Sequence, residues 1–260
     1  MNQVANVEII ESATPTLSAL PLRLADFDSL ASALDYAAQG ESGTNFYAGS
    51  GKLATVLPYR KLREQAQTLA KRLLSFPLER GARVAIVAET NPDFLRFFFA
   101  CQYAGLVPVA LPAVIHVGGH KAYVNQLNGL LKGCRASLAV SSSQLLPFLT
   151  EAAEGLGLQF VNAPSAFDEL PLKDITLKPS GPNETAYLQY TSGSTGFPRG
   201  VIITQESVMA NLLASGHGLD VRVDDRLVSW LPFYHDMGLV GCLLAPMATQ
   251  RSIDYLDTRD

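Results

Sequence analysis

The sequence predicts an α/β fold in which mostly parallel sheets are covered by helices. Three observations support this fold class. Short apolar runs rich in β-branched residues alternate with longer helix-like segments from about residue 58 to residue 161. The apolar runs are the kind expected of strands buried on both faces of a sheet. Glycine, or asparagine followed by proline, lies where the predicted helices end or begin.

The first predicted helix and strand follow residue 58. Apolar residues then recur at helical spacing, with basic residues between them: Leu62, Ala66, Leu69 and Leu73. The run RVAIVA at residues 83–88 predicts a buried strand. A helix and a strand that alternate in this way are the repeating unit of a parallel sheet.

The next helix has a predicted start and a predicted end. Asn91 is placed to cap it, Pro92 suits its first position, and Gly105 suits its carboxyl end. Residues 97–117 carry no charge and are long enough to span a bilayer. Glycine and prolines break this stretch, so a helix followed by a buried strand at 107–111 is the favoured interpretation, with no membrane span.

The remaining elements continue the alternation. Helices are expected near residues 121–132 and 144–154, with strands near 136–140 and 158–161. Four prolines in residues 163–183 predict a surface connection rather than a packed element. Further elements are then expected: strands at 186–190, 201–204 and 226–231, a helix over 205–214 capped by Thr204, and an apolar helical stretch that ends near Met247.

Composition limits the classes of function. The chain has 260 residues, 48% of them hydrophobic and 17% charged, which is typical of a globular protein. Its net charge of −4 argues against a broad nucleic-acid surface. The three cysteines lie far apart without a CxxC pair, which favours a reducing compartment, and the N-terminus lacks the features of a signal peptide. A cytoplasmic protein is expected.

The segment LQYTSGSTGFPRGV at residues 188–201 is the strongest candidate for a functional site. Glycine lets backbone N–H groups approach an anion closely, and serine and threonine add hydroxyl donors. Arg199 adds a permanent positive charge. The segment lacks the Walker pattern and lies between two predicted strands, as a hairpin loop would. Composition alone leaves two interpretations open: an exposed turn and a phosphate-binding loop.

The complete string TSGSTGFPRG resembles the signature loop of the adenylate-forming enzymes, the superfamily of acyl-CoA synthetases, luciferases and peptide-synthetase adenylation domains. Two further stretches, LPYRKLREQAQTLAKRL and CQYAGLVPVALP, resemble core motifs of the same superfamily. The stretch SWLPFYHDMGLVG is most similar to that of fatty acyl-AMP ligases. The likeness extends from about residue 27 to the end of the chain.

The resemblance implies a role for each matching residue. The loop that would hold the β- and γ-phosphates of ATP comprises Thr191, Ser192, Gly193, Ser194, Thr195 and Gly196. Arg199 occupies the place of the usual lysine and keeps its charge, with a different geometry. His235 matches the histidine near the reacting carboxylate and α-phosphate. The expected substrate pocket comprises Trp230, Asp236, Met237 and Gly238, although core packing is an equal alternative for Trp230 and for Leu239.

The resemblance also implies an activity: ATP-dependent conversion of a fatty acid to its acyl-adenylate, with Mg²⁺ neutralising phosphate charge. The expected acceptor is an acyl carrier protein of polyketide or lipopeptide synthesis. Two alternatives remain open, part of a fatty acyl-CoA synthetase that uses CoA and a non-catalytic nucleotide-binding module. No metal site is expected, and the other histidines, His116, His120 and His217, are expected on the surface or in loops.

The expected domain organisation is an N-terminal extension of unknown role at residues 1–26, followed by a partial AMP-binding domain at residues 27–260. In the superfamily, a C-terminal domain bears a catalytic lysine, and this chain is expected to lack it. A chain of this extent is therefore expected to be part of a longer enzyme and not to complete adenylation alone.

Overall fold

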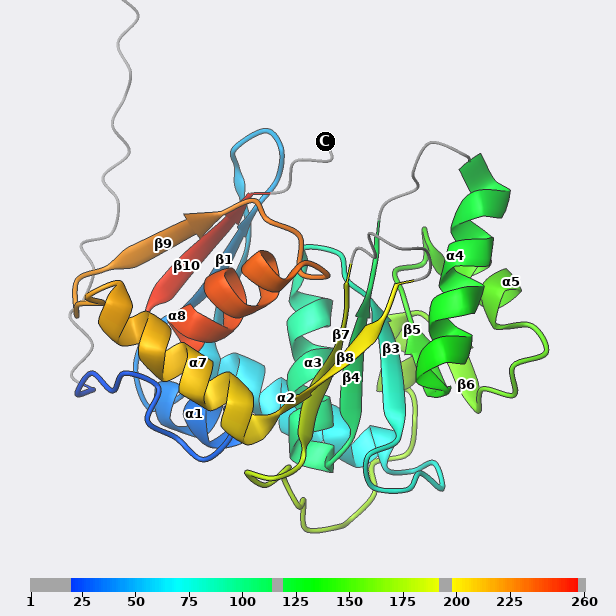
Figure 1. Ribbon diagram of the computed structural model, residues 1–260, viewed down its shortest axis with the longest axis horizontal. Helices are drawn as coiled ribbons and strands as arrows, with labels where there is room; N and C mark the ends of the chain where they lie inside the picture. The colour runs from blue at the N-terminus through cyan, green and yellow to red at the C-terminus, as the bar shows by residue number, and fades with distance from the viewer. Residues whose placement is uncertain (1–19, 114–118, 192–197, 257–260) are drawn as a thin grey trace, which may run out of the picture.

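The computed structural model describes residues 20–113, 119–191 and 198–256, which form two sheets with helices around them (Figure 1). The six-stranded sheet has the order β6-β5-β3-β4-β7-β8 and is parallel except for β8. Its strands are β3 (Arg83–Val87), β4 (Val107–Leu111), β5 (Ala136–Val140), β6 (Phe160–Asn162), β7 (Thr185–Tyr190) and β8 (Gly200–Thr204). The predicted mostly parallel α/β architecture is confirmed.

A second, four-stranded sheet has the order β2-β1-β10-β9. Its strands are β1 (Gly43–Tyr47), β2 (Leu53–Pro58), β9 (Arg226–Ser229) and β10 (Ser252–Leu256). Only β2 runs antiparallel to its neighbour. In both sheets, all strands are parallel except one edge strand. That strand, β2 or β8, pairs with its neighbour in the sequence as a hairpin.

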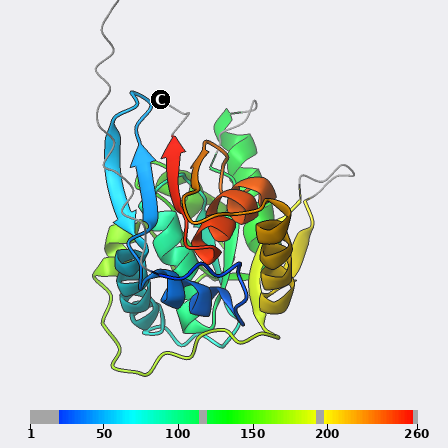
Figure 2. The same cartoon turned by 90° about the vertical axis from the view of Figure 1, so that its left-hand side faces the viewer.

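Helices separate the two sheets and cover one outer face (Figure 1). Between the sheets lie α1 (Leu30–Ala37), α2 (Tyr59–Leu73), α3 (Pro92–Ala104), α7 (Gln205–Gly218) and α8 (Ala245–Ala248). The far face of the six-stranded sheet carries α4 (Gly119–Cys134) and α5 (Leu146–Ala153). Figure 2 looks onto the four-stranded sheet, whose outer face has no helix over it within the described residues.

The buried side chains of β3 show how one strand serves two cores. Val84 and Ile86 belong to the apolar cluster between the sheets, whereas Ala85 and Val87 belong to the cluster beneath α4 and α5. Successive side chains of a strand point to opposite faces, so a strand buried on both faces must be apolar throughout. This is the physical reason that RVAIVA predicts the strand correctly.

The boundaries of α3 follow the expected local chemistry. The side chain of Asn91 accepts a hydrogen bond from the N–H of Phe94, and Pro92 begins the helix. Gly105 ends it in the left-handed conformation, with φ of 67°. The apolar stretch is therefore a 13-residue helix followed by β4. Among the described residues, no helix is both long and apolar enough to cross a lipid bilayer.

One sequence expectation is wrong at residues 163–183. This stretch includes a short packed helix, α6 (Pro164–Asp168), rather than only a surface connection. Phe167 is fully buried and meets the rings of Phe97 and Phe160 edge-on, at centroid distances of 5.0 and 4.9 Å. The side chain of Phe167 holds α6 against the core because it buries a large apolar area.

Buried glutamines join the middle helices to β7. Gln102 of α3 donates from Nε2 to the carbonyl of Ala186 at 2.8 Å, and its Oε1 accepts from Gln205 of α7 at 2.6 Å. The Oε1 of Gln205 accepts from the N–H of Leu30, at the start of α1. Each buried amide is thereby hydrogen-bonded, as a low-dielectric interior requires. The chain of bonds fixes β7 against three helices.

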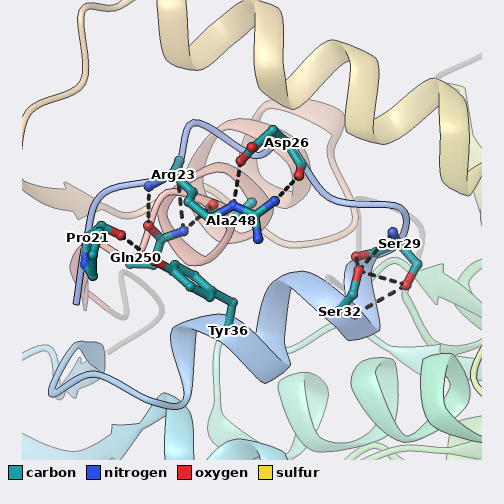
Figure 3. Close-up of polar contacts among 8 residues, drawn as sticks. All are labelled: Pro21, Arg23, Asp26, Ser29, Ser32, Tyr36, Ala248 and Gln250. Atoms are coloured by element: carbon teal, nitrogen blue, oxygen red, sulfur yellow. Dashed lines mark hydrogen bonds and ion pairs between the residues drawn. The ribbon is translucent and has the colours of Figure 1, made fainter.

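The N-terminal part of the described chain is held against the body near β10 (Figure 3). Gln250 accepts from the N–H of Arg23 at 2.8 Å, and its Nε2 donates to the carbonyl of Ala248 at 2.6 Å. The hydroxyl of Tyr36 donates to the carbonyl of Pro21 at 2.7 Å. Residues 20–26, which the sequence places in an extension, thus contact the same body as the rest of the described chain.

Candidate functional site

The carboxyl ends of the parallel strands meet along one edge of the six-stranded sheet. β3, β4, β5 and β7 run in the same direction, so the segments that follow them leave the sheet side by side. In an open α/β sheet, ligands bind outside the carboxyl ends of the strands. The glycine-rich segment follows β7 at this edge, which is where such a site is expected.

The glycine-rich segment is the loop of a hairpin, as the sequence predicts. β7 pairs antiparallel with β8, and the N–H of Thr191 donates to the carbonyl of Arg199 at 3.0 Å across the base of the loop. Thr191 and Arg199 are both exposed, so they face solvent at the base of the loop. The other predicted loop residues lie outside the described part of the chain: Ser192, Gly193, Ser194, Thr195 and Gly196.

The segment that carries His235 connects β9 to a helix and is anchored by one buried ring. Phe233 is fully buried between Phe94 of α3 and Tyr255 of β10, with centroid distances of 5.1 and 4.9 Å. The N–H of His235 donates to the carbonyl of Pro232, which makes a tight turn. The exposed histidine therefore stands on a turn whose base is fixed in the core between the two sheets.

The helix that follows is a π-helix, Met237–Leu244, which continues into α8. The N–H of Leu239 donates to the carbonyl of His235 at 2.8 Å. Pro246 has no N–H to donate, and the carbonyl of Cys242 instead accepts from the hydroxyl of Tyr255 at 2.7 Å. Segments of π-helix are rare and are frequently found at functional sites. The predicted apolar helical stretch up to Met247 is confirmed.

Gly238 allows this segment to fold back on itself. A Cβ at Gly238 would lie 2.2 Å from the carbonyl oxygen of Pro232, closer than any real Cβ contact. Gly238 is buried, and the absence of a side chain is what lets the helix start against the turn. This glycine therefore sets the position of His235, which lies between the two contacting residues.

The imidazole of His235 has a carboxylate partner next to it in the sequence. Nδ1 lies 2.7 Å from Oδ1 of Asp236, and the same oxygen accepts from the N–H of Met237 at 2.7 Å. The contact between the Met237 N–H and Nδ1 is longer, at 3.3 Å. The shorter distances favour Nδ1–H donating to Asp236, so Nε2 is the ring nitrogen that takes no part in these contacts.

A hydrogen bond joins the strand before the loop to the His235 segment. Gln189 of β7 donates from Nε2 to the carbonyl of Tyr234 at 2.7 Å. Gln189 lies two residues before Thr191, and Tyr234 lies directly before His235. The histidine and the start of the glycine-rich loop are thus on the same side of the molecule, although they are more than 40 positions apart in the sequence.

Buried tyrosines surround this junction at the same edge. Burial raises the pKa of Tyr123, and the nearby Glu89 and Tyr234 raise it further. Burial also raises the pKa of Tyr187, to which the nearby charge of Asp236 contributes. These hydroxyls are neutral at physiological pH. Glu89, which follows β3, accepts from the N–H of Ser142, which follows β5.

The predicted pocket residues all lie on the His235 segment, with different exposures. Trp230 and Met237 are 61% and 60% exposed, and Asp236 is also exposed. The interpretation as a core residue is therefore wrong for Trp230. It is right for Leu239, which is fully buried. Exposed apolar side chains beside a candidate catalytic group are suited to contact an apolar ligand.

A cavity of about 700 Å³ lies on the opposite face of β7. Leu188 and Tyr190 line it, whereas the alternate residue Gln189 contacts the His235 segment. Two arginines in its wall are already bonded: Arg80 to Glu184, and Arg83 to the carbonyl of Cys134. We do not assign the candidate functional site to this cavity on its volume alone, because the segment that carries His235 contacts the other face of β7.

The other histidines occupy the places predicted for them, where they are described. His120 contacts Glu151 at 2.5 Å on the surface, and His217 is exposed near the end of α7. His116 lies outside the described residues. No cluster of three potential metal ligands occurs within the described ranges. The cysteines Cys101, Cys134 and Cys242 are free thiols, the first two of them buried.

The sequence did not point to several residues of this edge. Gln189, Tyr187, Tyr123 and Glu89 belong to it through contacts between distant segments. For Gln189, one feature was available: a polar residue inside an otherwise apolar strand. Nothing in the sequence indicated which carbonyl it would meet.

The fold and the edge together define an α/β protein with a candidate anion site, built from a glycine-rich hairpin and a histidine. Comparison with known proteins identifies the family. The profile of the AMP-binding enzymes, described as "AMP-binding enzyme", matches residues 37–258. The chain belongs to this family, and the predicted membership in the adenylate-forming superfamily is confirmed.

Similar proteins include enzymes of fatty-acid activation. A putative acyl-CoA synthetase of Caulobacter vibrioides is 43% identical over 94% of this chain and 43% of its own length. The long-chain-fatty-acid–AMP ligase FadD32 of Mycolicibacterium smegmatis is 39% identical over 64% of this chain and 26% of its own length. The chain thus spans less than half of these relatives.

A solved structure from a study of fatty acyl-adenylate ligases of E. coli and L. pneumophila has the same fold. Its TM-score is 0.88 at 50% sequence identity, and the match covers 92% of this chain and 43% of that chain. The similarity confirms the fold class of the N-terminal domain of adenylate-forming enzymes.

Proposed function

We propose that this chain forms the phosphate and acyl-carboxylate part of a fatty acyl-AMP ligase. The observation that carries the proposal is the bond between Gln189 and Tyr234, because it joins the glycine-rich hairpin to the His235 turn. A reaction between a carboxylate and a nucleoside triphosphate needs both kinds of group at one place: donors for the phosphates and a polar group beside the reacting atoms.

The proposed reaction is an in-line displacement. A carboxylate oxygen of the fatty acid forms a bond to the α-phosphorus of ATP, and the bond from that phosphorus to the bridging oxygen breaks to release pyrophosphate. The loop from Thr191 to Gly196, with Arg199, would hold the departing phosphates by backbone N–H, hydroxyl and guanidinium donors. His235 would stabilise charge on the transferring group through Nε2–H when its ring is protonated.

The donor chemistry of these residues fits ATP. The loop is closed at its base by the bond between Thr191 and Arg199, and both of these residues are exposed there. Mg²⁺ would neutralise phosphate charge in such a reaction. The described residues offer no cluster of carboxylates for a cation, so we assign no residue of this chain to Mg²⁺.

The proposed substrate is a fatty acid, with Trp230 and Met237 as the apolar surface nearest the histidine. The proposed acceptor is an acyl carrier protein, because the stretch from Ser229 to Gly241 resembles that of acyl-AMP ligases. An acyl-CoA synthetase is the second candidate, which the name of the Caulobacter relative favours. A non-catalytic nucleotide-binding module is the third; it predicts ATP binding without dependence on a fatty acid.

Acid-dependent ATP–pyrophosphate exchange tests the proposal. It is measured for this chain alone, and for this chain joined to the residues that follow the matching segment in the M. smegmatis AMP ligase. We expect exchange with fatty acids from the joined protein and none from the chain alone. His235→Ala in the joined protein should lower the exchange rate about 100-fold or more.

Two results would contradict the proposal: exchange that persists undiminished in His235→Ala, or rapid turnover by these 260 residues alone. Adding CoA or a carrier protein to the active protein then identifies the acceptor, since only the correct one becomes acylated.

A further inference from the structure

β7 presents alternate side chains to two different surroundings. Tyr187 and Gln189 face the His235 segment, whereas Leu188 and Tyr190 line the cavity on the other face. Gln189 is only 9% exposed, and Tyr187 is 3% exposed. Two buried side chains of the strand that leads into the glycine-rich loop therefore lie against the turn that carries His235.

The orientation of the Gln189 amide follows from its partner. The carbonyl of Tyr234 can only accept, so the atom 2.7 Å from it must be Nε2, which donates. Oε1 is then buried and has no hydrogen-bond partner among the described residues. A buried acceptor left unpaired costs free energy. A methionine or leucine of similar size would avoid that cost, but it would also remove the donor to the carbonyl of Tyr234. The bond from Nε2 to the carbonyl of Tyr234 is therefore made at the expense of an unpaired Oε1.

We propose that Gln189 is a positioning residue for His235, which it holds through the carbonyl of Tyr234. The inference rests on the proposed function, in which His235 acts on the substrate. The hydrogen bond between Gln189 and Tyr234 is itself present without a ligand. Gln189 lies two residues before Thr191, and its partner carbonyl belongs to the residue directly before His235. The amide thus links the strand that leads into the glycine-rich loop to the turn that carries His235.

The matched comparison is Gln102, another buried glutamine that donates from Nε2 to a backbone carbonyl, that of Ala186 on β7. Gln189→Met and Gln102→Met each remove one side-chain amide. Gln189 belongs to β7, and Gln102 is hydrogen-bonded to β7. Both variants should lower the melting temperature. Only Gln189→Met should alter the His235 turn, because Gln102 contacts α7 and the start of β7 instead.

The experiment uses the 260-residue chain in solution NMR without ligand. The amide of Leu239, which donates to the carbonyl of His235, reports on the turn by hydrogen exchange. Losing one hydrogen bond should speed its exchange by about tenfold in Gln189→Met. The imidazole signals of His235 should shift or broaden in the same variant. Gln102→Met should leave both readouts as in the unaltered chain.

Unchanged Leu239 exchange and unchanged imidazole signals in folded Gln189→Met would overturn the inference. A measurement on the unaltered chain covers the case in which the variant does not fold. The Nε2 protons of Gln189 should exchange far more slowly than those of the exposed Gln39, and equal rates would also overturn it. Addition of pyrophosphate to the same sample tests the proposed function separately, so either idea can fail without the other.

Discussion

The imidazole Nδ1 of His235 lies 2.7 Å from Oδ1 of Asp236, and both side chains are more than 60% exposed. The carboxylate that contacts the ring thus belongs to the next residue in the sequence. The contact determines which ring nitrogen carries the proton in the neutral state. Nε2 is then an acceptor in the neutral ring, and it donates to a phosphate oxygen only when the ring carries a second proton.

A change at Asp236 tests that assignment. We expect neutral His235 to carry its proton on Nδ1, and Asp236→Asn to move part of the population to Nε2, because the amide is a weaker acceptor. Nitrogen-15 shifts of the imidazole measure the tautomer directly. Glu151→Gln is the control, since it should alter only His120. An unchanged His235 tautomer in Asp236→Asn would show that Asp236 does not orient the ring.

Gly238→Ala tests the close approach between the turn and the helix. The new Cβ would lie 2.2 Å from the carbonyl oxygen of Pro232, so the backbone must move. We expect the free energy of unfolding to fall by about 1–3 kcal/mol, as for other overpacked sites. In the active protein, the rate of adenylation should fall as well, because His235 moves with the turn.

Gly241→Ala is the matched control for that variant. Its Cβ would meet only Met237 Sδ at 3.7 Å, an ordinary contact. We expect stability to be unchanged or to rise by up to about 1 kcal/mol, since alanine favours a helix over glycine. Denaturant unfolding measures both variants. Equal losses of stability would mean that the approach to Pro232 has no special role.

Asp254 links stability to pH in the four-stranded sheet. Burial by itself would raise its pKa, but hydrogen bonds from Arg226 and Asn45 outweigh that effect, and the net pKa is lowered below 3.8. A carboxyl group with a lowered native pKa stabilises the fold above its unfolded pKa of about 3.9. That contribution disappears as the pH falls through the native pKa.

We therefore expect Asp254→Asn to destabilise the protein at pH 7 and much less at pH 3. The loss at pH 7 should be about 1 kcal/mol, because Arg226 is half-exposed and solvent screens its charge. Asp220→Asn, in an exposed ion pair with Arg222, should have no measurable effect. Thermal unfolding across this pH range distinguishes the outcomes, and a difference that does not vary with pH would contradict the assignment.

Local chemistry accounts for the elements that the sequence predicted well. The ends of α3 follow from Asn91, Pro92 and Gly105, which act within one turn of the helix. The hairpin of β7 and β8 follows from two apolar runs around a short glycine-rich loop. Such features are encoded within a few residues, so no knowledge of the tertiary structure was needed.

Strands β1, β2 and β10 of the four-stranded sheet could not be predicted from local sequence. β1 has the sequence GTNFY, which is polar and short, and its partner β10 lies about 200 positions away in the sequence. β2 is mostly exposed and has no clear periodicity. These strands form because Phe46 and Tyr255 pack together in the core between the sheets. The position of His235 has the same origin, since Phe233 joins that cluster.

The central claim is that the glycine-rich hairpin and His235 form a single phosphate site. Titration of the isotopically labelled chain with pyrophosphate, followed by NMR, tests it most directly. We expect the amides of residues 191–196 and the imidazole of His235 to shift together along one binding curve. Shifts in the loop with no response at His235, at saturating pyrophosphate, would contradict the claim.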